Sequence, residues 1–372
     1  MNEVVKPIAA MDGGGAPAKV LFQRHGAMAS ITLNRPAVLN AFDDEMRTLI
    51  ADEIPRIARN PDVYIVVLNS NSPKAFSAGG DVRALVKTAA ENQELAAEYF
   101  AGEYYLNWLL DCFSKPTVSL IDGLCMGSGA GLTCYNTHRV AGENYKFAMP
   151  ETAIGLFPDV GVSYVLARLP WPLGLYLGLL GRTIERADAH WLGIATHCIP
   201  AEAFPAIMSG LGNADPVDDM LDGLHQPQPA GPLQRDAAMI EDLFSGGSLA
   251  EIIKTLESAK GANAEFAKAT LADLRKRSPI SLAITDEHIR RCRTLDLRET
   301  LIQDYRLAIR CLAASDFAEG VRAALIDKDG TPRWQHQRIE DVMPNEVTSY
   351  FASLGAGELD LPTRDAMQSA RV

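Results

Sequence analysis

The sequence has few residues of the kinds that build metal centres and disulfide frameworks. Its 372 residues include six cysteines and seven histidines, and both types are scattered along the chain. No two cysteines form CxxC, and none stands at a zinc-like spacing from a histidine. These absences argue against a zinc site and favour small buried thiols in a reducing compartment. We therefore expect no metal ion and no redox cofactor.

Positive charge is also in deficit. Lys and Arg number 35 against 47 Asp and Glu, which gives a formal net charge of −12 at pH 7. This balance argues against nucleic acid or an anionic membrane as the main partner. An anionic small molecule is not excluded, because a few local amides and cations can bind phosphate within an acidic protein.

Long apolar segments are missing as well. The N-terminus lacks the basic and apolar regions of a secretory signal, and its composition is typical of a flexible leader over residues 1–17. The longest weakly charged run, residues 117–136, contains Asp122 and many glycines, which makes it a poor transmembrane helix. We predict a cytoplasmic protein that does not insert into membranes.

Common nucleotide-binding and nucleophile motifs are absent too. The chain has no GxxxxGK[ST] segment, and residues 127–131 read GSGAG, which is GxGxG and not GxGxxG. Met126 stands two residues before Ser128, so no GxSxG nucleophile elbow exists. These absences exclude the P-loop, dinucleotide-binding and α/β-hydrolase interpretations.

The sequence does contain a repeated order of buried strand, glycine turn and helix. Residues 64–69 form a β-branched run typical of a strand covered on both faces, and a glycine turn at 78–81 precedes a helix. The same order recurs from a strand at 116–121 to a helix at 129–135. Crossovers of this kind predict an α/β fold.

The character of the chain changes toward helix after residue 150. Residues 213–231 are rich in Asp, Pro, Gly and Gln, which indicates a loop or a linker insertion. From residue 233 onward the pattern is mostly helical. We predict a core over residues 18–200 and a mostly helical C-terminal region over 201–372.

The two glycine turns offer unpaired backbone N–H groups. Donors of this kind, fixed where negative charge develops on a carbonyl oxygen, form an oxyanion hole. The candidate donors are the amides of Gly80 and Ser128. The alternative is that glycine stands there only to allow a tight turn and close packing.

Three carboxylates lie in otherwise apolar or aromatic surroundings. Glu151 and Asp159 each follow a proline, and a carboxylate in a dry site can act as a general base or a nucleophile. The alternative for both is helix capping. Glu103 lies on a predicted helix beside Trp108, and by itself it is more typical of a solvated helix face.

Taken together, these segments closely resemble the enoyl-CoA hydratase/isomerase (crotonase) superfamily. The segments that carry the resemblance are residues 31–36 (ITLNRP), 74–81 (KAFSAGGD) and 122–129 (DGLCMGSG). Within the superfamily, residues 147–161 (FAMPETAIGLFPDVG) resemble the 3-hydroxyisobutyryl-CoA hydrolase branch, and residues 316–323 (DFAEGVRA) add to this likeness.

The resemblance implies an α/β fold built as a spiral of ββα turns, with a helical C-terminal region. It implies an acyl-CoA substrate, whose CoA part is no separate cofactor, and a possible homo-oligomer. It assigns the oxyanion hole to Gly80 and Ser128, where Ser stands in place of a usual Gly. The substrate-binding residues that it implies are Ala78, Asp81, Glu103 and Gly127.

The resemblance also assigns the reacting groups. Hydratases of the superfamily place two glutamates around a water molecule, and these map to Glu151 and to Gly131, which cannot act as an acid or a base. The hydrolase branch pairs the glutamate with an aspartate, which maps to Asp159. We therefore predict thioester hydrolysis by Glu151 and Asp159. The alternatives are an enoyl-CoA hydratase or isomerase that uses Glu151 alone, and a catalytically silent CoA-binding protein.

Overall fold

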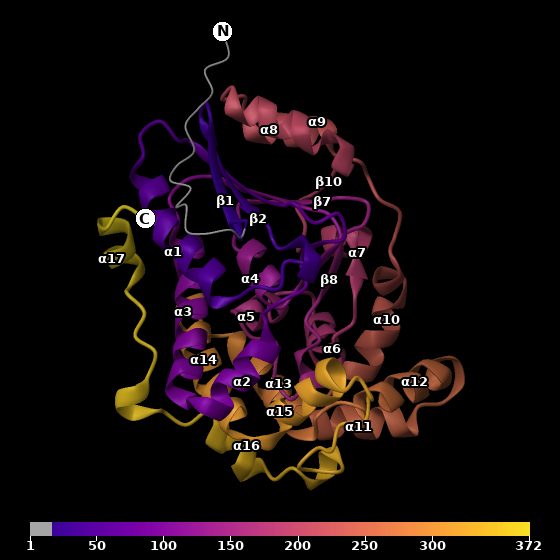
Figure 1. The fold of residues 1–372 in the computed structure, drawn as a ribbon. Helices are drawn as coiled ribbons and strands as arrows, with labels where there is room; N and C mark the ends of the chain where they lie inside the picture. The colour runs from indigo at the N-terminus through magenta and orange to yellow at the C-terminus, as the bar shows by residue number, and fades with distance from the viewer. Residues whose placement is uncertain (1–16) are drawn as a thin grey trace.

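The computed structural model describes residues 17–372 and contains two β-sheets surrounded by helices (Figure 1). The larger sheet has the order β1 (Val20–His25), β2 (Met28–Leu33), β3 (Ile65–Ser70), β5 (Thr117–Ile121), β7 (His138–Ala141) and β10 (His197–Cys198). The smaller sheet has the order β4 (Ala75–Ser77), β6 (Leu124–Met126), β8 (Lys146–Ala148) and β9 (Ile184–Glu185). The leader predicted for residues 1–17 lies, except for Pro17, outside the described residues.

Successive turns of the chain follow one pattern. Each turn adds one strand to the larger sheet, the next strand to the smaller sheet, and then a helical segment. The first such turn is β3, β4 and α2 (Val82–Glu91), and the second is β5, β6 and α4 (Ser128–Thr133). The third is β7, β8 and α5 (Val162–Leu166). The predicted α/β spiral of ββα turns is therefore confirmed.

The spiral explains why distant residues meet. Strand β4 pairs in parallel with β6, and β6 pairs in parallel with β8. Because the carboxyl ends of parallel strands share one edge of a sheet, the loops that follow these strands lie side by side. Those loops carry Gly80, Ser128 and Glu151, which are widely separated in the sequence.

The core is built by the predicted buried strands and by one long helix. The β-branched run of β3 is buried at Val66, Val67 and Leu68, because helices or the second sheet cover both of its faces. Helix α3 (Gln93–Cys112) buries aromatic side chains that include Tyr104 and Trp108. Helix α1 (Asp44–Arg59) runs on through Pro55 and begins with an Asp43 cap.

The prediction of a loop or linker at residues 213–231 is wrong over part of that range, because α9 (Val217–Leu224) lies within it. Leu221 of α9 is fully buried against Ile207 and Leu211 of α8 (Phe204–Gly212). The two helices lie together at one end of the molecule (Figure 1). The single apolar face of α9 is short and stands among Asp, Pro and Gly residues, which mask its helical period in the sequence.

The C-terminal half is mostly helical, as predicted. The spiral core is followed by α6 (Leu173–Leu180) and α7 (Arg186–Trp191). The later helices are α10 (Pro232–Phe244), α11 (Leu249–Ser258), α12 (Ala264–Leu274), α13 (Pro279–Cys292), α14 (Leu297–Ala313), α15 (Ser315–Val321), α16 (Pro344–Tyr350) and α17 (Arg364–Ser369). Helix α14 packs against α3, and α15 packs against the short 3₁₀ helix η2 (Glu151–Ile154). The boundary at residue 200 stays a prediction, since these helices complete the same core.

Two glycines let α15 approach η2 at backbone distance. A Cβ atom on Gly320 would lie 2.4 Å from the carbonyl carbon of Ile154. A Cβ atom on Gly155 would lie 2.3 Å from the backbone of Asp316. Because η2 begins at Glu151, the C-terminal region fixes the position of that carboxylate.

We expect Gly320→Ala to destabilise the protein, although alanine is the better helix former. The added methyl group collides with the backbone of Ile154, and overpacking of this kind costs about 1–3 kcal/mol. Urea unfolding measures the loss. The matched control is Gly223→Ala in α9, where nothing lies within 4 Å of the new Cβ, and this variant should be neutral or slightly more stable. Equal stability of the two variants would contradict the close packing of α15 on η2.

Candidate active site

A cavity of about 310 Å³ opens where the loops after β4, β6 and β8 meet. Helix α3 contributes Tyr99, Phe100 and Glu103 to its lining, and α2 and the C-terminal region contribute Val82, Leu85, Ala324 and Leu325. Of the residues predicted for the site, Ala78, Gly80, Glu103, Gly127, Ser128, Glu151 and Asp159 line this cavity. The structure therefore brings together residues that the sequence places on four separate segments.

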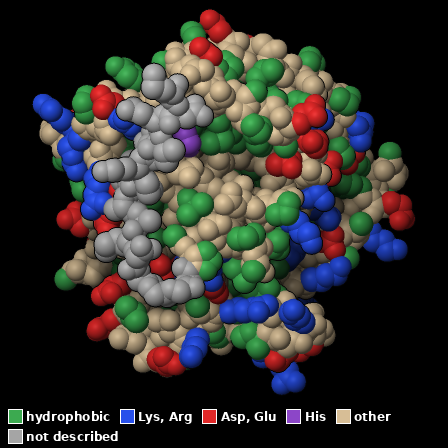
Figure 2. All heavy atoms as spheres, turned by 45° about the horizontal axis from the view of Figure 1, so that its top comes forward, with side chains coloured by type: hydrophobic (Ala, Val, Ile, Leu, Met, Phe, Trp, Pro, Cys, Tyr) green, Lys and Arg blue, Asp and Glu red, His purple; other side chains and the backbone are tan. Residues whose placement is uncertain are grey.

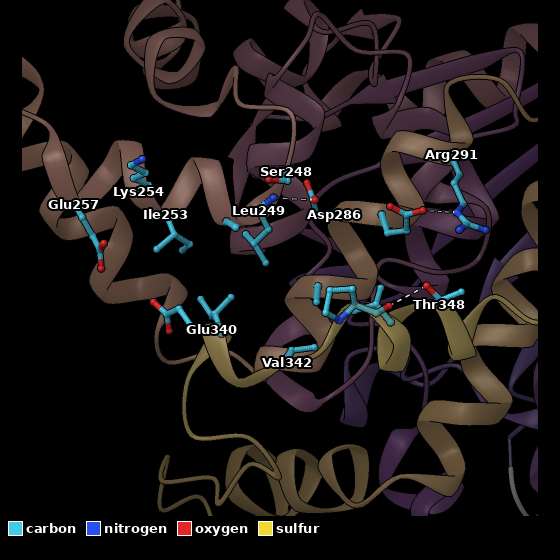
Figure 3. A pocket seen from close by; sticks show the side chains of 16 residues that line it. Ser248, Leu249, Ile253, Lys254, Glu257, Asp286, Arg291, Glu340, Val342 and Thr348 are labelled. Carbon is cyan, nitrogen blue, oxygen red and sulfur yellow. Dashed lines mark hydrogen bonds and ion pairs between the residues drawn. The ribbon is translucent and has the colours of Figure 1, made fainter.

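A larger hollow of about 550 Å³ lies elsewhere, between α11, α13 and the segment before α16 (Figure 3). Two of its charged side chains, Asp286 and Arg291, already have partners within the protein. Asp286 accepts a hydrogen bond from the Leu249 amide, and Arg291 donates to Glu287 (Figure 3). None of the predicted site residues lines this hollow, so we place the chemistry in the smaller cavity.

The two glycine turns touch each other at the floor of the cavity. Gly79 has a φ of +101° and Gly127 a φ of +48°, both in the region that favours glycine. A Cβ atom on Gly127 would lie 3.4 Å from Cα of Gly79 and 3.2 Å from Oε1 of Glu151. Glycine is therefore needed both for the backbone conformation and for this close approach.

The amides of Gly80 and Ser128 are free to bind a ligand. Ser128 is the first residue of α4, so its N–H has no acceptor within the helix. Around Gly80, the neighbouring Asp81 amide donates to the Phe42 carbonyl, whereas the Gly80 amide itself donates no backbone hydrogen bond within residues 17–372. The two N–H groups can therefore serve as a pair of donors for one carbonyl oxygen.

Glu151 is buried, and its carboxyl group is not fully hydrogen-bonded within the described residues. Its exposed fraction is 6%, and within residues 17–372 its Oε2 atom has no hydrogen-bond partner. Burial raises the pKa of Glu151 from 4.5 to about 8, because the charged form loses its hydration. At neutral pH the carboxyl group is therefore poised near its titration point.

Asp159 lies in the same cavity and is held by a tyrosine. Tyr104 of α3 donates a hydrogen bond of 2.8 Å to Asp159 Oδ2. Burial raises the pKa of Asp159 well above its usual value, and the charges of Glu151 and Glu103 raise it further. Two carboxyl groups that interact in this way titrate as a pair, so one of them carries a proton when the other is ionised.

The loop that carries Asp159 depends on the C-terminal helices. Val160 has a φ of +51°, which is strained for a β-branched residue. The next amide, of Gly161, donates a 2.7 Å hydrogen bond to Asp304 of α14. Asp304 in turn pairs with His288 of α13 at 2.6 Å, and both side chains are fully buried. This ion pair holds the strained loop in place.

Glu103 is buried at the inner end of the cavity, so the solvated helix face considered from the sequence does not apply. Burial raises its pKa, while hydrogen bonding with Ser128 and Tyr99 and the charge of Arg47 lower it. The cavity thus contains a third carboxyl group, on the same helix as Tyr104.

Asp81 differs from the other predicted site residues, because it does not line the cavity. Its side chain caps α2 and accepts a hydrogen bond of 3.4 Å from the Ala84 amide. Arg35 lies 3.7 Å from its other oxygen. Asp81 therefore shapes the turn that presents Gly80.

Gly131 has no space for a glutamate. A Cβ atom there would lie 2.8 Å from Nδ2 of Asn107 and 2.8 Å from Cβ of Val160. The second carboxylate of the cavity is consequently supplied by Asp159, on the far side of Val160. The structure thus agrees with the sequence in offering no acid or base at position 131.

Four residues of the site were missed in the sequence: Tyr99, Tyr104, His288 and Asp304. Tyr104 meets Asp159 across 55 positions, and Asp304 meets Gly161 across 143. Tyr99 and Tyr104 lie on a helix with several aromatic residues, and nothing in a helical pattern shows which of them reaches a carboxylate. The sequence gives no sign that His288 and Asp304 pair with each other, since this contact exists only between two packed helices.

These features define a cavity with two free backbone amides and three buried carboxyl groups on a spiral of ββα turns. The family model for enoyl-CoA hydratase/isomerase matches residues 28–351. The chain belongs to this family.

Similar proteins carry more specific names. The chain is 40% identical over 351 residues to the mitochondrial 3-hydroxyisobutyryl-CoA hydrolase of Xenopus tropicalis, with 92% of this chain and 90% of that protein covered. Its structure is similar to an enoyl-CoA hydratase from Rhodobacter sphaeroides, with a TM-score of 0.86, 37% identity and coverage of 92% and 100%. It is also similar to a carnitinyl-CoA dehydratase from Mycobacterium thermoresistibile, with a TM-score of 0.87, 33% identity and coverage of 92% and 99%.

The same comparisons bear on location. The name of the Xenopus relative places that protein in mitochondria, so the cytoplasmic location predicted here finds no support in it. Between residues 17 and 372, every helix is too short or too polar to cross a membrane. The face shown in Figure 2 carries acidic and basic side chains interspersed, in keeping with a net charge of −12.

Proposed function

We propose that this chain hydrolyses a short branched 3-hydroxyacyl-CoA thioester, with 3-hydroxyisobutyryl-CoA as the substrate and 3-hydroxyisobutyrate and CoA as the products. The observation that carries the proposal is the pair Glu151 and Asp159 in one dry cavity, beside Gly131, where no glutamate fits. The name of the Xenopus relative supports the same reaction. No metal or separate cofactor is part of the proposal.

In the proposed reaction, the amides of Gly80 and Ser128 bind the thioester carbonyl oxygen and stabilise the negative charge that forms on it. Removal of one such donor typically costs a factor of about 10²–10³ in kcat. Glu151 either removes a proton from the attacking water or attacks the carbonyl carbon itself to form an anhydride. In both routes the carbon–sulfur bond breaks and CoA leaves as a thiolate.

Asp159 has the proton-transfer role in this proposal. Its pKa is raised, so it can carry a proton while Glu151 is ionised, and it can pass that proton toward the CoA thiolate. Tyr104 keeps the carboxyl group oriented through its 2.8 Å hydrogen bond. Water then supplies the oxygen of the acid product and restores the proton.

The deciding experiment compares thiol release with hydration. Purified protein is given 3-hydroxyisobutyryl-CoA and free thiol is measured, and it is given crotonyl-CoA and the loss of enoyl absorbance is measured. We expect fast thiol release and slow or no hydration. Rapid hydration of crotonyl-CoA without thiol release would refute the proposal.

The second candidate function is an enoyl-CoA hydratase or isomerase that uses Glu151 alone. Its support is the enoyl-CoA hydratase from Rhodobacter sphaeroides, whose structure resembles this chain over nearly all its length. The third candidate, a silent CoA-binding protein, is disfavoured by the two buried carboxyl groups. Binding of an acyl-CoA without turnover, and without any difference between the unaltered protein and Glu151→Ala, would be needed to revive it. Oligomeric state and cellular location stay predictions.

We expect the hydrolytic rate to rise with pH up to about pH 8. Glu151 must be ionised to act as base or nucleophile, and burial moves its pKa from 4.5 to about 8. Below that pH the group is mostly protonated, so log kcat/KM should rise with a slope near one. A pH–rate profile measures this limb. A rising limb centred near pH 4.5, the usual glutamate value, would show that a desolvated Glu151 does not control the reaction.

A further inference from the structure

The segment that carries Asp159 passes through two consecutive residues in the left-handed region of backbone conformation. Val160 has a φ of +51° and Gly161 a φ of +71°. Glycine adopts such values freely, whereas a β-branched valine keeps them only when its surroundings hold it there. The contacts of Val160 therefore decide how the preceding residue, Asp159, is presented to the cavity.

The side chain of Val160 is held by packing. Its exposed fraction is 1%, and its Cβ atom lies 2.8 Å from the point where a Cβ atom on Gly131 would stand. Valine thus lies directly against the glycine of α4. This packing places the side chain, but the direction of the peptide group that follows Val160 depends on polar contacts.

The peptide group between Val160 and Gly161 is hydrogen-bonded at both of its polar atoms. Tyr135, which follows α4 by two residues, donates a hydrogen bond of 2.5 Å from its hydroxyl group to the Val160 carbonyl oxygen. The amide of Gly161 donates at 2.7 Å to Asp304 of α14. A Cβ atom on Gly161 would lie 2.3 Å from Oη of Tyr135, so the hydroxyl group packs closely on this turn. Tyr135 and Asp304 therefore hold one peptide group from opposite sides.

This peptide group lies next to the carboxyl group proposed to transfer a proton. The side chain of Asp159 accepts a 2.8 Å hydrogen bond from Tyr104, and its backbone carbonyl accepts one of 2.9 Å from the Val162 amide. Rotation about the N–Cα bond of Val160 to a negative φ would turn Asp159 relative to α5 and α14. Its carboxyl group would then leave the position that Tyr104 and the cavity define.

We propose that Tyr135 is a positioning residue, whose hydroxyl group holds Val160 in the left-handed conformation and so keeps the Asp159 carboxyl group in place for proton transfer. Tyr135 does not line the cavity and acts through the Val160 carbonyl group. The short segment that begins with Ser128, the oxyanion donor, thus ends on the residue that fixes Asp159. This inference rests on the proposed hydrolase function and deepens it.

The first test uses Tyr135→Phe, which removes the hydroxyl group and keeps the ring. Thiol release from 3-hydroxyisobutyryl-CoA is measured. We expect kcat to fall about tenfold or more, since a strained backbone conformation of this kind is disfavoured by a factor of about 5–150 once it is no longer held. KM should change little, because Tyr135 is not part of the cavity lining. An unchanged kcat would overturn the proposal.

The matched control is Tyr145→Phe. Tyr145 is a buried tyrosine between β7 and β8 that does not line the cavity. Neither kcat nor KM should change in this variant. A fall in kcat equal to that of Tyr135→Phe would show that loss of any buried tyrosine hydroxyl group disturbs the site, and would count against the specific role of Tyr135.

The second test removes the strain that Tyr135 is proposed to hold. In a Val160→Gly background the left-handed conformation is no longer disfavoured, so adding Tyr135→Phe should change kcat by no more than about twofold. Any loss caused by Val160→Gly itself cancels, because only the ratio with and without Tyr135→Phe is compared in each background. Val160→Asn gives the same comparison with a larger side chain, since asparagine also tolerates a positive φ.

A purely structural role of Tyr135 would lower kcat equally in the unaltered and the Val160→Gly backgrounds. That result would overturn the proposal and leave the hydrolase intact. Absence of thiol release from 3-hydroxyisobutyryl-CoA in the unaltered protein would instead reject the proposed function itself, and with it the inference.

Discussion

Glu151→Gln should lower kcat for thiol release by at least about 10³-fold. General-base catalysis contributes about 10²–10⁴-fold, and loss of a covalent nucleophile costs about as much or more. Glutamine has nearly the same shape and fits the same dry pocket, so the fold and substrate binding should persist. Single-turnover thiol release measures the chemical step, and KM should change much less. A variant that retains a tenth of the activity would show that Glu151 is not the reacting group.

The same variant should be more stable than the unaltered protein in alkaline solution. The folded-state pKa of Glu151 is about 8 and therefore above the unfolded value of 4.5. The folded state thus binds more protons between these values, and stability falls as pH rises through this window. Glutamine carries no charge to bury, so at pH 9 its gain should be about 1–3 kcal/mol. Urea unfolding at pH 4 and pH 9 tests the sign, because the gain should be small at pH 4, which lies below both pKa values.

Isotope labelling distinguishes the two possible roles of Glu151. A single turnover in water enriched with heavy oxygen puts the label into Glu151 if an anhydride forms and water attacks its enzyme-derived carbonyl. Label confined to the product acid refutes the route in which Glu151 forms an anhydride and water attacks the Glu151 carbonyl. It is the result expected for the general-base route. Mass spectrometry of the peptide that contains Glu151 and of the product acid provides both readings.

Asp304→Asn should destabilise the protein by about 3–5 kcal/mol, the usual cost of breaking a buried ion pair. Asp304 and His288 have no exposed side-chain surface, and their contact of 2.6 Å is lost as a charge pair in the variant. Burial lowers the pKa of His288, but Cys292 and Asp304 outweigh that effect and raise it to about 10. The imidazolium would be left buried without its counter-charge. Thermal or urea unfolding measures the loss.

Activity should fall along with stability in this variant, even at temperatures where it is folded. The Gly161 amide loses a charged acceptor, so the strained Val160 can relax and move Asp159. The control is Asp329→Asn, whose exposed ion pair with Arg322 should contribute little to stability. In the double variant with His288→Gln, the combined loss should be smaller than the two single losses together. Additive losses would contradict the coupling of the buried pair.

Local sequence patterns predicted most of the spiral, because several neighbouring residues in each strand or helix show the same apolar pattern. The β-branched run of β3 and the aromatic face of α3 are visible within a few positions of the chain. Helix α9 was missed for the opposite reason: its apolar face is short and is surrounded by turn-forming residues. Short amphipathic segments give too little periodicity to outweigh such neighbours.

The candidate site was predicted from the sequence about as completely as the fold. Gly80, Ser128, Glu151 and Asp159 stand in motifs that the sequence displays, and the structure places all four around one cavity. Asp81 belonged to the same motif, yet it caps a helix outside the cavity. A motif fixes the order of residues along a turn, whereas the direction of each side chain depends on what packs against that turn.

The sequence by itself determined the fold class, the glycine turns, the two candidate reacting carboxyl groups and the lack of an acid or base at Gly131. These follow from residue types, their spacing and the family resemblance they carry. Only the tertiary structure decided that α15 closes on η2, that Asp304 and His288 hold the Asp159 loop, and that Glu103 is buried in the lining of the cavity. Those contacts join residues that are far apart in the chain. Burial and shared protons arise from such contacts, so the chemistry of the cavity exists only in the folded molecule.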